Sequence, residues 1–150
     1  MTSLRRNTTA ALFGATAFGV MMMFGVPLLP SVPFLKYEPS GMIILTATVL
    51  LGPVGGIFAC FLKDAVFLLV GAGNIFGVTS DFINTAVYAL AAGLIIRRAS
   101  TVQNHLLGYL AGTLAGTLVM IPVNLLVLQL EFGMTPEAIM GMMASGVIPN

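Results

Sequence analysis

Charged side chains are scarce in this sequence. Its 150 residues include six Lys and Arg and five Asp and Glu, so that 7% are charged, whereas a soluble domain holds about 25%. Hydrophobic residues make up 58%, and the mean hydropathy is +1.04. This composition excludes an ordinary soluble domain, and no nucleic-acid partner is expected.

Cysteine and histidine are each present once, as Cys60 and His105. One cysteine excludes a disulfide framework, and no C-x-x-C or H-E-x-x-H pattern indicates a metal site. The ten methionines have no His or Cys beside them, which favours adaptable apolar packing over metal binding. A G-x-x-x-x-G-K-[ST] phosphate loop is also missing, so any ATP-driven work requires a partner.

Long apolar runs dominate what is present. Crossing about 30 Å of hydrocarbon takes about 20 helical residues. The runs predict an all-α membrane protein, a single domain over residues 1–150 with five transmembrane segments. The second is only about 15 Å long at 1.5 Å per residue, so it either crosses or is re-entrant. The expected segments are Thr8–Leu29, Met42–Leu51, Val54–Gly71, Phe76–Ile96 and His105–Leu130.

Two arginine doublets orient the chain. Residues 5–6 precede a run that partly resembles a signal peptide, but the run is long and lacks a small-residue cleavage site, which favours a retained helix. Because cytoplasmic loops are richer in Lys and Arg, residues 5–6 and 97–98 both lie on the cytoplasmic side if all four intervening segments cross. We therefore expect a plasma-membrane protein with a cytoplasmic N-terminus and residues 36–40 outside.

Three ionisable residues, Lys63, Asp64 and Asp81, fall at membrane depth. Such groups are costly and usually pair or face a polar cavity. Lys63 and Asp64 lie about 100° apart on a helix, so that one of them can reach Asp81. A buried ion pair is favoured over ligand contact, although both remain open. Because no nucleophile or metal set accompanies the carboxylates, an enzyme is disfavoured.

Other polar positions also interrupt the apolar helices. Asp81, Asn84 and Tyr88 share one face of the fourth segment, where they either join helices or contact a ligand. Asn124 follows Pro122, whose ring frees a backbone carbonyl one turn earlier. Because its amide both donates and accepts hydrogen bonds, Asn124 is a ligand candidate.

Small residues at four-residue spacing form flat stripes that allow close approach of another helix. The stripe in the fifth segment is expected to pack within the chain. The stripe in the first segment is expected either to do the same or to dock a separate membrane protein. The stripes are Ala11, Ala15 and Gly19 in the first segment, and Gly108, Gly112 and Gly116 in the fifth.

The polar loop over residues 34–41 has a distinctive sequence. Its motif, Phe34-Leu35-Lys36-Tyr37-Glu38-Pro39-Ser40, is followed by Leu51-Gly52-Pro53-Val54-Gly55-Gly56 and by Phe61-Leu62-Lys63-Asp64. This combination resembles the S components of energy-coupling factor (ECF) transporters, and most closely the riboflavin type. The resemblance extends from the first helix to the last residues.

The resemblance implies a six-helix membrane subunit that binds a vitamin from outside. Such a subunit docks on a transmembrane coupling subunit driven by two ATPase subunits, so this chain is expected to be no enzyme itself. Ala11 and Ala15 match the family's A-x-x-x-A docking motif, and Gly19 extends it. The sixth helix is missing from the sequence, and we expect the chain to be truncated before it.

For the ligand, the resemblance implies riboflavin rather than a bound cofactor or metal. Asn124 matches an asparagine that holds the isoalloxazine ring, and Asn150 matches another at the start of the sixth helix. A flat apolar ring with amide-like edges suits an apolar pocket with few polar groups. Tyr37 is expected to cover the ring. The predicted substrate-binding residues are Leu35, Lys36, Tyr37, Glu38, Ser40, Asn124 and Asn150.

Two alternatives stay open at this point. A related vitamin or flavin-like molecule is one, within the same transport class. The other is an assembly or structural membrane protein whose small-residue faces pack on partners without any small ligand, although the polar loop argues against it.

Overall fold

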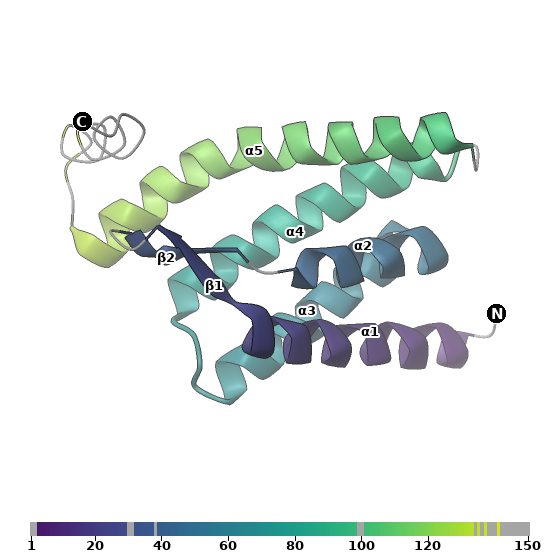
Figure 1. The fold of residues 1–150 in the computed structure, drawn as a ribbon, viewed down its shortest axis with the longest axis horizontal. Helices are drawn as coiled ribbons and strands as arrows, with labels where there is room; N and C mark the ends of the chain where they lie inside the picture. Colours follow the sequence, from purple (N-terminus) through teal and green to yellow (C-terminus); the bar gives the residue numbers. More distant parts are fainter. Residues whose placement is uncertain are drawn as a thin grey trace.

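The fold is an all-helical bundle with one short β-hairpin (Figure 1). The computed structural model describes residues 3–29, 32–37, 39–98, 101–133, 135, 137 and 141. Five helices were predicted, and five are present in this part of the chain. The elements are α1 (Ser3–Phe24), β1 (Val26–Leu29), β2 (Val32–Tyr37), α2 (Ser40–Leu51), α3 (Pro53–Leu69), α4 (Ile75–Ile96) and α5 (Val102–Phe132).

The segment after α1 differs from the prediction. The first helix was expected to reach Leu29, but it ends at Phe24, and strands replace much of the expected polar loop. Three prolines within residues 27–33 remove backbone donors and disfavour helix. The two antiparallel strands pair Val26 with Tyr37 and Leu29 with Val32. Proline is tolerated here because both strands are edge strands.

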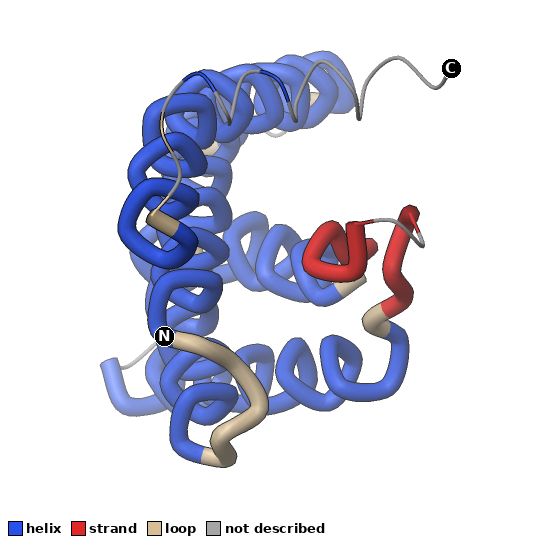
Figure 2. The backbone as a smooth tube through the Cα atoms, turned by 90° about the vertical axis from the view of Figure 1, so that its left-hand side faces the viewer, coloured by secondary structure: helices blue, strands red, loops and turns tan. Residues whose placement is uncertain are grey.

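Each helix packs against the next one in the sequence (Figures 1 and 2). Helix α1 contacts α2 and α3, α4 contacts α2 and α3, and α5 contacts α4 alone among the described elements. The buried centre holds small side chains, including Ala17, Ala47, Ala59 and Cys60, each 0% exposed. Small residues at the contacts allow helix backbones to approach closely, which is how membrane helices gain packing energy.

The glycine stripe of α5 packs within the chain, as predicted. A Cβ placed on Gly112 lies 2.9 Å from Tyr88 Cδ2, and one on Gly116 lies 2.7 Å from Asn84 Oδ1. Gly108 meets Ile96 in the same way. Asn84 and Tyr88 of the predicted polar stripe therefore face the α5 interface, where they fill the space that the glycines leave.

Among the residues that the structure describes, three helices are long and apolar enough to cross a membrane, namely α1, α4 and the part of α5 over Val102–Val127. Helix α2 has 12 residues, or about 18 Å. Gly52 alone separates it from α3, and the positive φ of 82° there lets the chain reverse. The two arginine doublets lie at one end of the bundle, as predicted, because Arg6 and Arg97 line the same hollow.

Candidate functional site

A polar contact joins α4 and α5 near the hairpin end of the bundle. The Ser80 hydroxyl donates a hydrogen bond of 3.5 Å to Asn124 Oδ1. Ser80 is buried, whereas Asn124 is exposed, and the Asn124 amide nitrogen has no partner in the described part of the chain. Ser80 thus holds one end of the Asn124 amide while its two N–H donors stay open.

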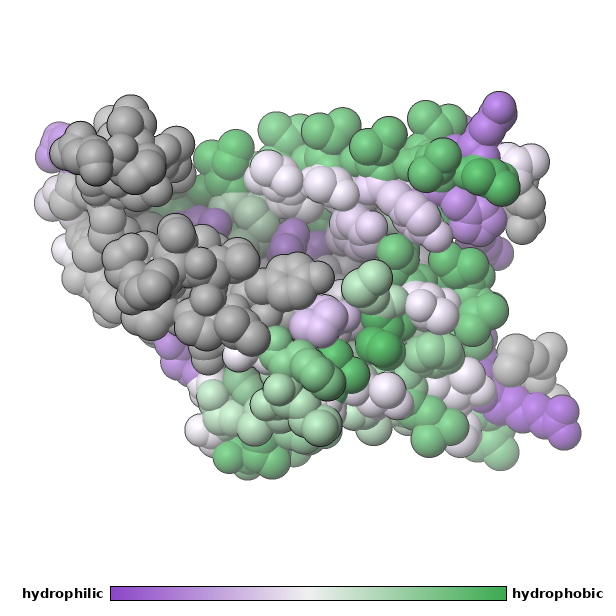
Figure 3. Space-filling view, viewed as in Figure 1, coloured by the Kyte–Doolittle hydropathy of each residue, from purple (hydrophilic) through white to green (hydrophobic). Residues whose placement is uncertain are grey.

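The surface around α5 changes character from one side to the other. Hydrophobic residues follow the outer edge of α5, and more polar residues lie in the recess beneath it (Figure 3). Pro122 lies inside α5, two residues before Asn124, and interrupts the hydrogen-bond ladder of the helix there. A polar side chain beside freed backbone within an apolar surface offers both donors and acceptors to a ligand.

The predicted loop residues lie on other elements than Asn124, which belongs to α5. Leu35, Lys36 and Tyr37 lie on β2, and the hairpin packs on no described helix. Ser40 begins α2 and is 1% exposed, so it lies inside the bundle. Glu38 and Asn150 fall outside the described residues. Among the described residues, no contact joins β2 or α2 to α5, and the predicted substrate-binding set stays a prediction.

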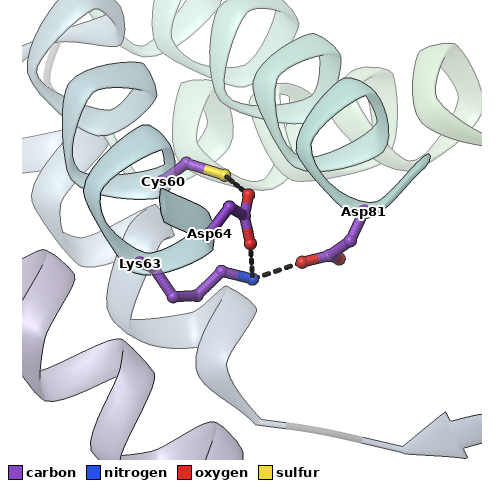
Figure 4. A network of polar contacts seen from close by, with 4 residues as sticks. All are labelled: Cys60, Lys63, Asp64 and Asp81. Atoms are coloured by element: carbon purple, nitrogen blue, oxygen red, sulfur yellow. Dashed lines mark hydrogen bonds and ion pairs between the residues drawn. The ribbon is translucent and has the colours of Figure 1, made fainter. Parts of the chain in front are cut away.

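The charged residues at membrane depth form one network across α3 and α4 (Figure 4). Lys63 donates a hydrogen bond to Asp81 Oδ2, and its Nζ lies 3.2 Å from Asp64 Oδ1. The Cys60 thiol donates to Asp64 Oδ2 at 3.3 Å. The predicted reach from α3 to Asp81 is confirmed, and Lys63 is the residue that makes it.

Burial in this network is uneven. Lys63 is 1% exposed and Asp64 4%, whereas the Asp81 side chain is 28% exposed. Lys63 lies between two carboxylates on two helices, so it connects α3 to α4 at the buried level. Breaking such a pair leaves a buried charge uncompensated. This geometry agrees with the structural interpretation of the three charges.

Helix α1 carries two stripes of small residues on different faces. Ala10, Gly14 and Ala17 are buried, and a Cβ on Gly14 lies 2.7 Å from the Ala59 carbonyl oxygen. The predicted docking stripe points elsewhere: Ala11 and Ala15 are exposed, and a Cβ on Gly19 meets nothing within 4 Å. The face that packs inside the chain is therefore distinct from the predicted docking face.

Sequence reasoning missed two members of these polar sets, Ser80 and Cys60. Ser80 lies beside Asp81 in an otherwise apolar helix, and its hydroxyl was the available signal. Cys60 precedes Asp64 by four residues, which places both on one helix face. It was read only as an apolar residue in an apolar run.

These features define a multi-pass, all-helical membrane protein with polar groups on an open side of its bundle. The chain belongs to the family described as ECF transporter, substrate-specific component, whose family model matches residues 5–150. The fold agrees with a solved structure described as the S component of a bacterial ECF transporter. The two share a TM-score of 0.79 and 27% identity, over 94% of this chain and 83% of the other.

The chain is also similar to curated proteins that are named riboflavin transporters. The riboflavin transporter RibU of Streptococcus thermophilus is 28% identical over 127 residues, or 83% of this chain. RibU of Staphylococcus aureus is 29% identical over 87% of the chain, and RibU of Lactococcus lactis is 24% identical over 83%. The aligned part of the chain spans 60%, 68% and 62% of these relatives, respectively.

Proposed function

We propose that this chain is a riboflavin-binding subunit of an ATP-driven ECF importer. The observation that supports the proposal best is the similarity to riboflavin transporters from three organisms, together with membership of the substrate-specific component family. In this proposal ATP hydrolysis would belong to two partner ATPase subunits. A transmembrane coupling subunit connects them to this chain.

The ligand would be held on the side of α5 that Asn124 occupies. Asn124 combines an exposed amide with an anchor at Ser80, so its open N–H groups meet the carbonyl edge of an isoalloxazine ring. Leu35, Lys36, Tyr37 and the neighbouring Glu38 would close the site from the hairpin. Because Ser40 is buried at the start of α2, it would position the hairpin rather than touch the vitamin.

The coupling subunit would dock on the outer face of α1. Ala11 and Ala15 are exposed there, and the space over Gly19 is empty within the chain. Close helix approach requires such a face, and the opposite face is already taken by α3. Arg5, Arg6, Arg97 and Arg98 would then lie on the cytoplasmic side, in accordance with the positive-inside rule.

The test is direct ligand binding. The full product of the gene is purified in detergent and titrated with riboflavin, whose fluorescence is quenched when the ring is buried. We expect a yellow preparation, or saturable quenching that an excess of thiamine or biotin does not reduce. A colourless protein that leaves riboflavin fluorescence unchanged would contradict the proposal, and selective binding of another vitamin would replace riboflavin within it.

A further inference from the structure

At the arginine end of the bundle, two guanidinium groups from distant parts of the sequence line one hollow. It has a volume of about 310 Å³, and its lining includes Arg6 of α1, Arg97 after α4, and the turn around Gly52. Arg97 lies over this turn, because a Cβ placed on Gly52 would be 3.8 Å from Arg97 Cδ and 3.9 Å from Nη1. The hollow therefore brings together α1, the α2–α3 turn and the end of α4.

The charges around this hollow have one sign. The hollow is lined by Arg6, Arg97 and residues 49–54, and these residues with their neighbours over 3–8 and 94–98 include four arginines and no carboxylate. Neither Arg6 nor Arg97 has an ion pair within the described part of the chain. Two guanidinium groups at one hollow repel each other unless an anion lies between them. The described part of the protein therefore supplies no negative charge to balance these two guanidinium groups.

Backbone groups add to the positive potential. Helix α3 starts at Pro53, and its hydrogen-bond ladder begins with Gly56 N–H donating to Gly52 O. The N–H groups of Val54 and Gly55, in the first turn, have no partner within the helix. The N-terminal end of a helix favours anions, and phosphate above all.

Apolar side chains also line the hollow, beside the two guanidinium groups. Leu50 and Val54 line it and are 65% and 63% exposed. A small inorganic anion or an acidic protein loop gains nothing from these side chains. A phospholipid has both required parts, a phosphate for the guanidinium groups and acyl chains for Leu50 and Val54. Basic pockets between membrane helices are known to take anionic lipid headgroups.

We propose that this hollow, defined by Arg6, Arg97 and the α2–α3 turn, binds the phosphate of an anionic phospholipid in the adjacent leaflet. The bound lipid joins α1 to α4, which have no direct contact within the described structure. The orientation rule for basic residues requires only charge in this region. It does not require two guanidinium groups from different helices to share one hollow. The assignment does not depend on which vitamin the protein carries.

Native mass spectrometry tests the proposal with phosphatidylglycerol and phosphatidylcholine of identical acyl chains. Wild-type protein is expected to retain phosphatidylglycerol preferentially, by roughly thirtyfold for two arginine contacts. The double variant Arg6→Gln/Arg97→Gln should lose this preference. The matched variant Arg5→Gln/Arg98→Gln removes the same charge outside the hollow and should keep it.

Four results would overturn the proposal. The first is equal retention of both lipids by wild-type protein. The second is an equal loss of preference in both double variants, which would indicate general attraction. The third is displacement of the lipid by inorganic phosphate at equimolar concentration, which would indicate a free-anion site. If Arg6→Gln/Arg97→Gln retained phosphatidylglycerol but no longer assembled with the coupling module, the hollow would belong to a protein partner instead.

Discussion

The ammonium group of Lys63 on α3 contacts the carboxylate of Asp81 on α4, 18 positions later in the chain. Asp64 pairs with the same ammonium group at 3.2 Å. One cation therefore serves two carboxylates that are not equally buried. This asymmetry predicts that substitutions of the three residues lower the stability of the fold by different amounts.

Lys63→Met should destabilise the protein more than Asp81→Asn. The first change leaves two carboxylates without a cation, and breaking a buried pair in this way costs about 3–5 kcal/mol. The second leaves Lys63 paired with Asp64 and affects a side chain that is 28% exposed. The temperature at which half the detergent-purified protein remains monodisperse in size-exclusion chromatography measures both. Equal losses, or a larger loss for Asp81→Asn, would contradict the assignment.

The Cys60 thiol should react slowly in the folded protein. It is 0% exposed and donates to Asp64, so a maleimide reaches it only after the helices separate. We expect labelling over hours in mild detergent and within minutes in sodium dodecyl sulfate. Val102→Cys in a Cys60→Ala background gives the exposed control, since Val102 is 77% exposed. Equal rates for Cys60 in both detergents would show that α3 is not packed as described.

Asn124→Ala should weaken riboflavin binding by roughly 1–3 kcal/mol, because a buried ligand group loses its partner. Ser80→Ala should weaken it less, since it removes only the anchor of the amide. Thr113→Ala is the control on the same helix, because the Thr113 hydroxyl bonds the Tyr109 carbonyl of its own helix. Fluorescence titration measures all three. Unchanged affinity in Asn124→Ala would remove this residue from the proposed site.

Two substitutions on α1 separate docking from folding. Ala15→Leu adds bulk to the exposed face and should abolish riboflavin uptake in cells while leaving binding by purified protein intact. Ala17→Leu adds the same bulk where the residue is 0% exposed, and overpacking there costs about 1–3 kcal/mol or more. That variant should lose thermal stability. Normal uptake by Ala15→Leu would refute the docking face.

Gly112→Ala should loosen the contact between α4 and α5. The new methyl carbon would lie 2.9 Å from Tyr88 Cδ2 and 3.1 Å from the Tyr88 carbonyl oxygen, and such overpacking costs about 1–3 kcal/mol. Gly41→Ala in α2 meets nothing within 4 Å and should be neutral or slightly stabilising. Thermal inactivation of purified protein compares them. A Gly112→Ala variant as stable as Gly41→Ala would contradict this packing.

Much of the fold was predictable because a membrane helix is indicated by a continuous run of apolar residues along the sequence. Apolar length gave five helices, and four of their ten predicted ends lie within one residue of the observed ones: Leu51, Val54, Phe76 and Ile96. The end of α1 was misplaced because hydrophobicity does not distinguish a helix from an apolar strand. Val26–Leu29 is an apolar segment that suits either the predicted helix or the observed strand. Only its pairing with Val32–Tyr37 shows that it is a strand.

The candidate site was predictable only in parts. Asn124 stood out because an amide is rare in an apolar helix, but its anchor Ser80 lies 44 positions away, and no local pattern connects the two. Cys60 was missed for a different reason: it lies only four residues before Asp64, but a thiol in an apolar run was read as one more apolar side chain. The loop motif identified a family, yet family motifs do not say which of these side chains converge.

The sequence by itself determined that this is a membrane protein. It also determined approximately which residues form helices and that the arginines share one end, because these properties depend on composition along the chain. Only the tertiary structure decided which charge Lys63 meets, which face of α1 stays open and that Arg6 and Arg97 share one hollow. Those outcomes depend on the rotation and depth of each helix against its neighbours. The glycine and alanine contacts that set them involve residues far apart in sequence.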